Sequence, residues 1–462
     1  MSLQFITGGS GAGKSEYLSR LVCEESVRRP HDNFIVVVPE QYTMETQKKL
    51  VHMHSRKGIL NIDVVSFERL AYKVFEELGG GNRPVLDDTG KNLIVRRVLE
   101  KEKKKLDYFG SSIEKTGFVS ELKSVISELL QYGITPQQLG EIGENVKEKQ
   151  QLSAKLKDIR LVYKEFMAFL STNYITSEEI LDVLCGLVEK SKLIAGSEII
   201  FDGFTGFTPI QYKLMRLLLV YSKGIKISVT IDKKERPTGH EGWNNLFFMS
   251  KEMMNRLIAI CEEEGINVDD TVCVDRDINY RYEGAKDLAY LERNLFRYKG
   301  GVYTGTPENI RIYEGSNPKE ELQYIVSEIL QLTRKEGFRY HDIAVVTADL
   351  ETYGKVAANM MKQNDIPAFL DYKRSVAANP YVEMLCSALE IVEKGYPYDT
   401  MFRYLRTGLT GISRHDIDML ENYCLAVGIR GSRAWHEPWK KKMKRSTYQP
   451  ELETLNALRE QI

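Results

Sequence analysis

The sequence predicts an α/β protein in which parallel-sheet domains carry large helical insertions. Short, continuous apolar runs such as residues 34–38 are typical of strands that are buried on both faces of a sheet. These runs alternate with amphipathic helical stretches, which is the order expected of a parallel sheet. Between residues 87 and 191, and again after residue 376, the pattern becomes purely helical. We therefore expect sheets that are interrupted by helical bodies.

The first predicted strand (3–6) and the first predicted helix (16–27) flank a glycine-rich loop. The loop follows the pattern G-x-x-x-x-G-K-S, which between a strand and a helix predicts a phosphate-binding loop. The alternative is a glycine-rich turn that merely links strand to helix, and the Lys-Ser pair argues against it. The predicted nucleotide-binding residues are Gly8, Gly9, Ser10, Gly11, Ala12, Gly13, Lys14 and Ser15.

This loop predicts that the chain binds ATP with Mg²⁺. Glycines allow backbone N–H groups to point at phosphate oxygens, and the helix that starts near Lys14 adds the positive end of its dipole. Lys14 is expected to contact the β and γ phosphates, and the hydroxyl of Ser15 is expected to hold the metal ion.

Residues 198–202 and 225–231 predict two further strands of the same sheet. Asp202 ends the first of them, where P-loop proteins place a second acid that holds Mg²⁺; a simple turn aspartate is the alternative. In ATP-hydrolysing motors a glutamate follows this acid and polarises the attacking water, but here Gly203 follows. Losing a positioned base costs a factor of roughly 10² to 10⁴ in rate. The sequence therefore predicts nucleotide binding with weak or no hydrolysis, and it offers no catalytic residue.

The order of these segments predicts four domains. A nucleotide-binding domain is interrupted by a helical insertion, and a second α/β unit is followed by a second helical insertion that looks cut off midway through a helix. We therefore expect a portion of a longer protein. The ranges are 1–86 with 192–297 for the first domain, 87–191 for its insertion, 308–375 for the start of the second α/β domain and 376–462 for its insertion.

The second α/β unit is predicted from three apolar runs and the amphipathic stretches between them. A glycine-rich linker at 298–307 separates this unit from the first domain. The expected strands are 309–313, 342–346 and 366–370, and the expected helices are 318–332 and 353–363.

Composition narrows the class of protein. The 462 residues carry a net charge of −1, so only local patches would contact nucleic acid. The six cysteines are scattered without a C-x-x-C pair, which supports neither a zinc site nor an iron–sulfur cluster and indicates a reducing cytoplasm. No apolar run is long enough to span a membrane.

Two runs of basic residues are predicted to be solvated surface, namely 101–105 and 440–445. The second run lies beside Trp435 and Trp439. Basic residues next to aromatic rings can also bind a nucleic-acid strand, through phosphate contacts and base stacking. That reading of the second run stays open as the less favoured alternative.

The order of the segments resembles superfamily 1 helicases of the UvrD/RecB kind, which have two RecA-like domains with helical insertions. The departures lie in the second helicase motif, where Gly203, Thr205 and Gly206 replace Glu, Gln and Asp, and the third motif is not recognisable after Ile231. The matching stretches are 8–15 (first motif), 66–71 (Thr-Phe-His-x-Leu-Ala), 201–211 (Asp-Glu-Phe-Gln-Asp-Thr…Gln) and 338–346 with 366–367 (opening of the second motor domain).

An intact phosphate loop in a decayed motor, together with Val-Pro-Glu-Gln-Tyr at 38–42, resembles the B subunit of bacterial AddAB-type helicase–nucleases. The resemblance implies a heterodimer with a motor A subunit that acts on DNA ends and single-stranded DNA. Such complexes resect double-strand breaks for homologous recombination and respond to Chi. The family's nuclease and its iron–sulfur cluster belong to a C-terminal region, so neither is expected in these residues.

Two other functions remain open from the sequence. An active superfamily 1 helicase would need a water-activating carboxylate from elsewhere, for example Glu198 or Asp232. A small-molecule P-loop kinase is the second alternative, although such enzymes are usually compact single domains.

Overall fold

The computed structural model of the protein describes most of the chain, and it divides that chain into two units, Met1–Arg311 and Ile312–Ile462. The first residues of the predicted linker, 298–300, and the end of the second basic run, 444–445, lie outside the described residues. The described ranges are 1–79, 84–115, 117–146, 149–176, 178–235, 242–297, 301–371, 376–443 and 451–462.

Unit 1 is built on a parallel sheet with the strand order β3-β2-β6-β7-β1-β8, in which β9 also pairs with β1. The four strands predicted for the first domain, at 3–6, 34–38, 198–202 and 225–231, are confirmed as β1, β2, β6 and β7. The strands are β1 (Ser2–Gly8), β2 (Asn33–Val37), β3 (Ile62–Val65), β6 (Ser197–Phe201), β7 (Gly224–Thr230), β8 (Asn267–Val268) and β9 (Val272–Cys273).

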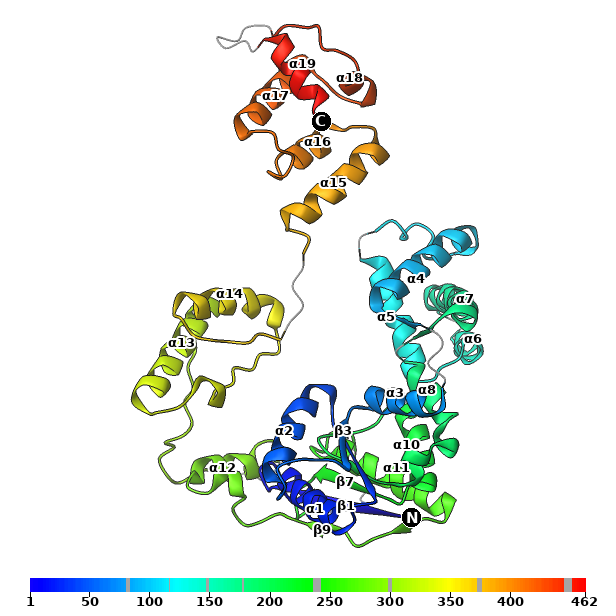
Figure 1. The fold of residues 1–462 in the computed structure, drawn as a ribbon, viewed down its shortest axis with the longest axis vertical. Coiled ribbons are helices and arrows are strands. Elements are labelled where there is room, and N and C mark those ends of the chain that lie inside the picture. Colours follow the sequence, from blue (N-terminus) through cyan, green and yellow to red (C-terminus); the bar gives the residue numbers. More distant parts are fainter. Residues whose placement is uncertain are drawn as a thin grey trace. The chain divides into compact units, whose positions relative to one another are not determined.

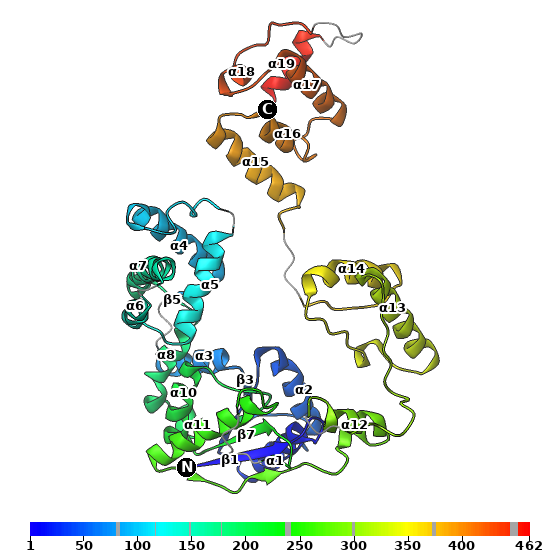
Figure 2. The same cartoon turned by 180° about the vertical axis from the view of Figure 1, so that it is seen from behind.

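Helices cover both faces of this sheet (Figure 1, and from behind in Figure 2). Successive strand residues point to opposite faces, so Phe5 lies in one apolar core and Ile6 in the other. The core around Ile6 is closed by α1 (Lys14–Arg28) and α2 (Thr43–Met53). The core around Phe5 is closed by α3 (Phe67–Leu78), α8 (Ile180–Cys185), α10 (Pro209–Tyr221) and α11 (Phe248–Glu264), with the short α9 (Lys192–Ala195) beside them.

A helical body with its own core projects from this sheet domain (Figure 1). Its core residues run from Leu86 to Leu170, whereas the buried side chains of α8 belong to the core of the sheet. The domain boundaries at 86/87 and 191/192 stay predictions. The elements are α4 (Asp88–Glu102), α5 (Phe118–Gln131), α6 (Pro136–Asn145) and α7 (Gln150–Asn173), with a parallel pair of short strands, β4 (Val85–Leu86) and β5 (Ile175–Thr176).

Unit 2 begins with the two predicted helices, α13 (Pro318–Lys335) and α14 (Leu350–Gln363). The strands predicted at 309–313, 342–346 and 366–370 are wrong, because the described residues of this unit form no strand. Ile312, Val346 and Phe369 are each more than nine-tenths exposed. A strand needs a neighbour for its backbone N–H and C=O groups, and these apolar runs have none here. The assignment of 308–375 to a second sheet domain stays a prediction.

The rest of unit 2 is helical, and its core contains both tryptophans that flank the second basic run. Trp435 and Trp439 are only 5% exposed, and the Trp439 indole donates a 2.8 Å hydrogen bond to the carbonyl of Ala434. Neither ring is therefore presented for stacking on a base, and the nucleic-acid reading of this run is wrong for these two residues. The helices are α15 (Pro380–Lys394), α16 (Tyr398–Leu405), α17 (Arg414–Val427), α18 (Ser432–His436) and α19 (Leu452–Glu460).

None of the helices in the described ranges combines the length and the apolar character needed to cross a membrane.

Glu198, at the start of β6, is a mostly buried carboxylate held by two cations. Arg29 Nη2 and Lys226 Nζ each lie 2.6 Å from one of its oxygens. Burial opposes ionisation, but the hydrogen bonds from Lys226 and Arg29 outweigh it, so the pKa of Glu198 lies below its usual value. The carboxylate therefore stabilises the fold at neutral pH.

We expect Glu198→Gln to lower the free energy of unfolding by about 2 kcal/mol at pH 7, because it leaves two partly buried cations without their anion. Since the folded-state pKa is lowered, this stabilisation is complete above the unfolded-state pKa of about 4.3 and is lost as the pH falls below it. Urea unfolding at neutral pH and well below that pKa should show the difference between wild type and variant shrinking in acid. Glu40→Gln is the control, because its pair with Arg69 is more than half exposed on both sides and should matter little. Equal losses for the two variants would contradict the prediction.

Candidate nucleotide-binding site

The predicted phosphate loop lies where β1 passes into α1, at the carboxyl edge of the parallel sheet. The loop curls back on itself through Gly11 (φ 72°) and Gly13 (φ 96°), a left-handed conformation that glycine adopts without strain. Gly13 directly precedes α1, so the loop closes on the positive end of that helix. Ligands of open α/β sheets bind at this edge.

Lys14 is folded back over the loop, where its ammonium donates 2.9 Å hydrogen bonds to the carbonyls of Gly8 and Gly9. Burial lowers the pKa of Lys14, while the carboxylates of Asp202, Asp275 and Glu292 act in the opposite direction. A partly buried ammonium that holds only carbonyl oxygens is suited to transfer its hydrogen bonds to incoming phosphate oxygens.

Asp202 follows β6 as predicted, and its charge opposes the lowering of the pKa of Lys14 by burial. Its Oδ1 accepts a 2.5 Å hydrogen bond from the hydroxyl of Ser228 on the neighbouring strand β7. Ser15 is the second residue of α1, in its first turn at the same edge. The described ranges contain no group of three or more His, Cys, Asp or Glu side chains suited to a metal ion. The assignment of Ser15 and Asp202 to Mg²⁺ on a bound nucleotide stays a prediction.

The position after Asp202, where a motor carries its water-activating glutamate, is structurally committed to glycine. Gly203 has φ 83°, and its N–H donates to the Ser228 hydroxyl at 3.3 Å. A Cβ at this position would meet the ring of Pro39 at 3.4 Å, and any other residue would adopt a strained backbone. The sequence offered Glu198 and Asp232 as alternative water-activating carboxylates, and these two residues have different surroundings. Glu198 lies at the opposite end of β6 within its cation pair, whereas Asp232 follows β7 and lies 3.5 Å from Arg297.

A segment far along the chain also contacts the phosphate loop, and no motif in the sequence pointed to it. The amide of Asn279 donates to the Ser10 carbonyl at 3.3 Å across 269 positions of sequence, and the Arg281 N–H donates to the Gly11 carbonyl at 3.3 Å. This segment contains a 3-10 turn (Tyr280–Tyr282) and α12 (Lys286–Asn294), which carries Glu292. Such long-range contacts leave no periodic or spacing signal in a single sequence.

The stretch that resembles the second helicase motif has a structural role in much of its length. Phe67 contacts Phe201, Phe204 and Phe207 with ring centroids 5.7, 5.4 and 6.0 Å apart. Gln211 completes the capping box at the start of α10. These residues of the stretch therefore pack and cap elements of the domain.

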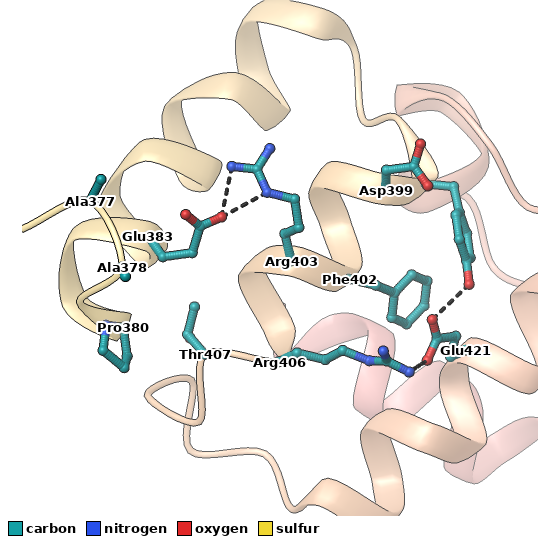
Figure 3. Close-up of a pocket in the computed structure, with 11 residues that line it drawn as sticks. Ala377, Ala378, Pro380, Glu383, Asp399, Phe402, Arg403, Arg406, Thr407 and Glu421 are labelled. Atoms are coloured by element: carbon teal, nitrogen blue, oxygen red, sulfur yellow. Dashed lines mark hydrogen bonds and ion pairs between the residues drawn. The ribbon is translucent and has the colours of Figure 1, made fainter. Parts of the chain in front are cut away.

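A separate cavity of about 530 Å³ opens in unit 2 between α15, α16 and α17 (Figure 3). Its two arginines are already paired: Arg403 contacts Glu383 at 2.7 Å, and Arg406 contacts Glu421. The Tyr398 hydroxyl donates to Glu421 at 2.7 Å, and burial together with that carboxylate raises the pKa of Tyr398 to about 12. Because both cations are neutralised within the unit, we do not assign a phosphate site to this cavity.

Comparison with known proteins places the chain among relatives with one shared description. The sequence model of a family described as "ADDB, N-terminal" matches residues 5–292. Proteins described as the B subunit of an ATP-dependent helicase/deoxyribonuclease align with nearly the whole chain. Those of Lachnoclostridium phytofermentans, Clostridioides difficile and Clostridium novyi are 42%, 36% and 34% identical over 100%, 100% and 95% of the chain.

The alignment covers 40%, 40% and 38% of those three relatives, so the chain spans about two-fifths of their length. The family match covers more than half of the chain and includes the phosphate loop, Asp202 and α12 as far as Glu292. The resemblance inferred from the order of the sequence motifs is thereby confirmed. The chain belongs to the AddB family and corresponds to the N-terminal portion of its members.

Proposed function

We propose that this chain is the ATP-binding, non-motor part of a helicase-like subunit in a heterodimeric ATP-dependent helicase/deoxyribonuclease. The observation that carries the proposal is an asymmetry at one sheet edge. The phosphate loop with Lys14 is intact, whereas the position of the water-activating glutamate is held by Gly203 in a left-handed conformation. Such a site binds Mg²⁺–ATP through the loop, Ser15 and Asp202 and hydrolyses it slowly or not at all.

The relatives' description, as the B subunit of an ATP-dependent helicase/deoxyribonuclease, supports a partner A subunit that supplies the motor. We propose that the complex works in the cytoplasm, where it resects DNA double-strand breaks for homologous recombination, and that this chain contacts DNA ends and single-stranded DNA and takes part in Chi recognition. The nuclease of the family is not assigned to these residues. A small-molecule kinase has no support from the family assignment.

An active motor remains the competing function, because Asp275 and Glu292 both act electrostatically on Lys14. Glu292, however, is bonded to the loop itself rather than placed beyond it, where an attacking water would lie. Robust DNA-stimulated hydrolysis by the isolated full-length subunit would favour the motor.

The test uses the reconstituted heterodimer with one phosphate-loop lysine replaced at a time. We expect Lys14→Ala in this subunit to leave DNA unwinding within about threefold of wild type, because the partner drives it. The equivalent change in the A subunit should lower unwinding at least about 100-fold, since an electrostatic ligand of the transferred phosphate is lost. The rate of DNA-stimulated ATP hydrolysis, measured on the same two complexes, should be retained or lost together with unwinding. If unwinding collapses only when this subunit is changed, the proposal is wrong.

A further inference from the structure

We propose that Glu292 sets the nucleotide preference of the phosphate loop: its carboxylate occupies an anion position on the loop, so the site favours a nucleoside diphosphate over a triphosphate. This inference rests on the proposed function, because it assumes that the loop binds nucleotide. The inference assigns a role in nucleotide binding to Glu292, which neither the phosphate-loop motif nor Asp202 predicts.

The contact is direct. The backbone N–H of Ser10 donates to Glu292 Oε1 at 3.2 Å, across 282 positions of sequence. The same oxygen lies 3.0 Å from where a Cβ on Gly9 would be, so glycine at that position is what allows the carboxylate to approach. Backbone N–H groups of such a loop are the ligands of nucleotide phosphates. Glu292 therefore takes a donor that a phosphate oxygen would otherwise use.

The position of Glu292 along the loop points to the outer phosphates. Its charge acts on Lys14, the residue that reaches the β and γ phosphates. Burial and two further carboxylates, Asp275 and Asp232, raise the pKa of Glu292, while Arg297 acts in the opposite direction. Around Lys14 the carboxylates of Asp202, Asp275 and Glu292 act together with one cation, Arg281, so acids outnumber cations among these groups.

This arrangement opposes the terminal phosphate more than the others. ATP carries one more negative charge than ADP and extends its charged end to the region where Glu292 and Asp275 lie, and like charges at short range in a partly buried site repel strongly. A diphosphate ends earlier and leaves Glu292 on Ser10. A triphosphate has to displace the carboxylate before its last phosphate reaches Lys14.

The helix that carries Glu292, α12, also binds the last residues of unit 1. Asp287, one helical turn or so before Glu292, accepts hydrogen bonds from the backbone N–H groups of Glu308 and Asn309 at 2.9 and 2.7 Å. The side-chain amide of Asn309 adds a third at 2.8 Å. The same helix therefore touches the nucleotide loop and the last residues of unit 1.

The experiment compares two nucleotides on the purified 462-residue chain. Calorimetric titration with Mg²⁺–ADP and with the Mg²⁺ complex of a non-hydrolysable β,γ-imido analogue of ATP gives a ratio of the two dissociation constants. We expect wild type to bind ADP more tightly. Glu292→Gln keeps the size of the side chain and an acceptor for Ser10 but removes the charge, and should improve binding of the ATP analogue about tenfold while changing ADP binding less than about threefold. Glu292→Ala should shift the ratio in the same direction.

Glu283→Gln is the matched control. Glu283 lies between the 3-10 turn and α12 but is mostly exposed, and its ion pair with Arg276, at 3.8 Å, is long. The ratio of the two dissociation constants in this variant should equal that of wild type. An unchanged ratio in Glu292→Gln, with both nucleotides still bound, would overturn this inference and leave the proposed function intact. Absence of nucleotide binding in wild type and every variant would overturn the proposed function instead.

Discussion

Replacing Lys14 with alanine is expected to weaken binding of both ATP and ADP to the chain by at least about 100-fold. The ammonium sits partly buried over the loop, with its hydrogen bonds directed at two backbone carbonyls that it can exchange for phosphate oxygens. Charge-assisted hydrogen bonds contribute about 1.5–3 kcal/mol each, and every 1.4 kcal/mol is a factor of ten in affinity. Two such bonds to phosphate account for the expected loss. Calorimetric titration with each Mg²⁺–nucleotide complex measures it.

The control is Lys49→Ala, which removes a lysine from the adjacent α2. Lys49 is more than a third exposed and pairs with Glu16 at 3.0 Å, so its loss should not affect nucleotide binding. Thermal unfolding of Lys14→Ala should match wild type within a few degrees, because a desolvated charge is removed together with its hydrogen bonds. Unchanged ATP affinity in a folded Lys14→Ala chain would show that the loop is not the nucleotide site.

Replacing Trp435 with alanine is expected to destabilise unit 2 by about 3–5 kcal/mol, the range for emptying a large aromatic site in a core. Trp435 packs against Trp439 and Phe402 with ring centroids 5.4 and 6.3 Å apart, and it is only 5% exposed. Urea unfolding followed by near-ultraviolet circular dichroism reports the loss. Nucleotide binding by unit 1 should be unchanged below the unfolding transition.

Trp243→Ala is the matched control, because Trp243 is 85% exposed and its removal should cost less than about 0.5 kcal/mol. A Trp435→Ala chain with wild-type stability but weaker binding to a fluorescent single-stranded oligonucleotide would contradict this prediction. Such a result would restore nucleic-acid binding as the function of the second basic run.

Local patterns predicted the elements of the first sheet domain well. The apolar run that becomes β2 is continuous and those of β1 and β6 are largely apolar, so a parallel sheet covered on both faces is their natural place. Helix starts are local in the same way: the capping box at Thr135 involves only residues within one turn, and the structure has both of its hydrogen bonds.

The errors came from residues whose environment depends on distant chain. The runs at 309–313, 342–346 and 366–370 have strand-like composition, but whether an apolar run is buried depends on partners that its own sequence does not specify. Trp439 looked available for stacking beside a basic run, yet the rings of Tyr423 and Trp435 pack on it. Pattern recognition identifies residue types, and packing decides which of them reach solvent.

By itself, the sequence determined that this protein has a phosphate loop ending in Lys14, an acid at 202 without a following glutamate, and the family to which both belong. These features are short, contiguous and tied to backbone geometry, so they can be recognised without knowledge of the fold. Only the tertiary structure decided that Glu198 serves stability, that Gly203 is locked in its backbone conformation, and that Glu292 reaches the loop from 282 positions away. Electrostatics depends on distance in space, and a linear sequence carries that distance only between near neighbours.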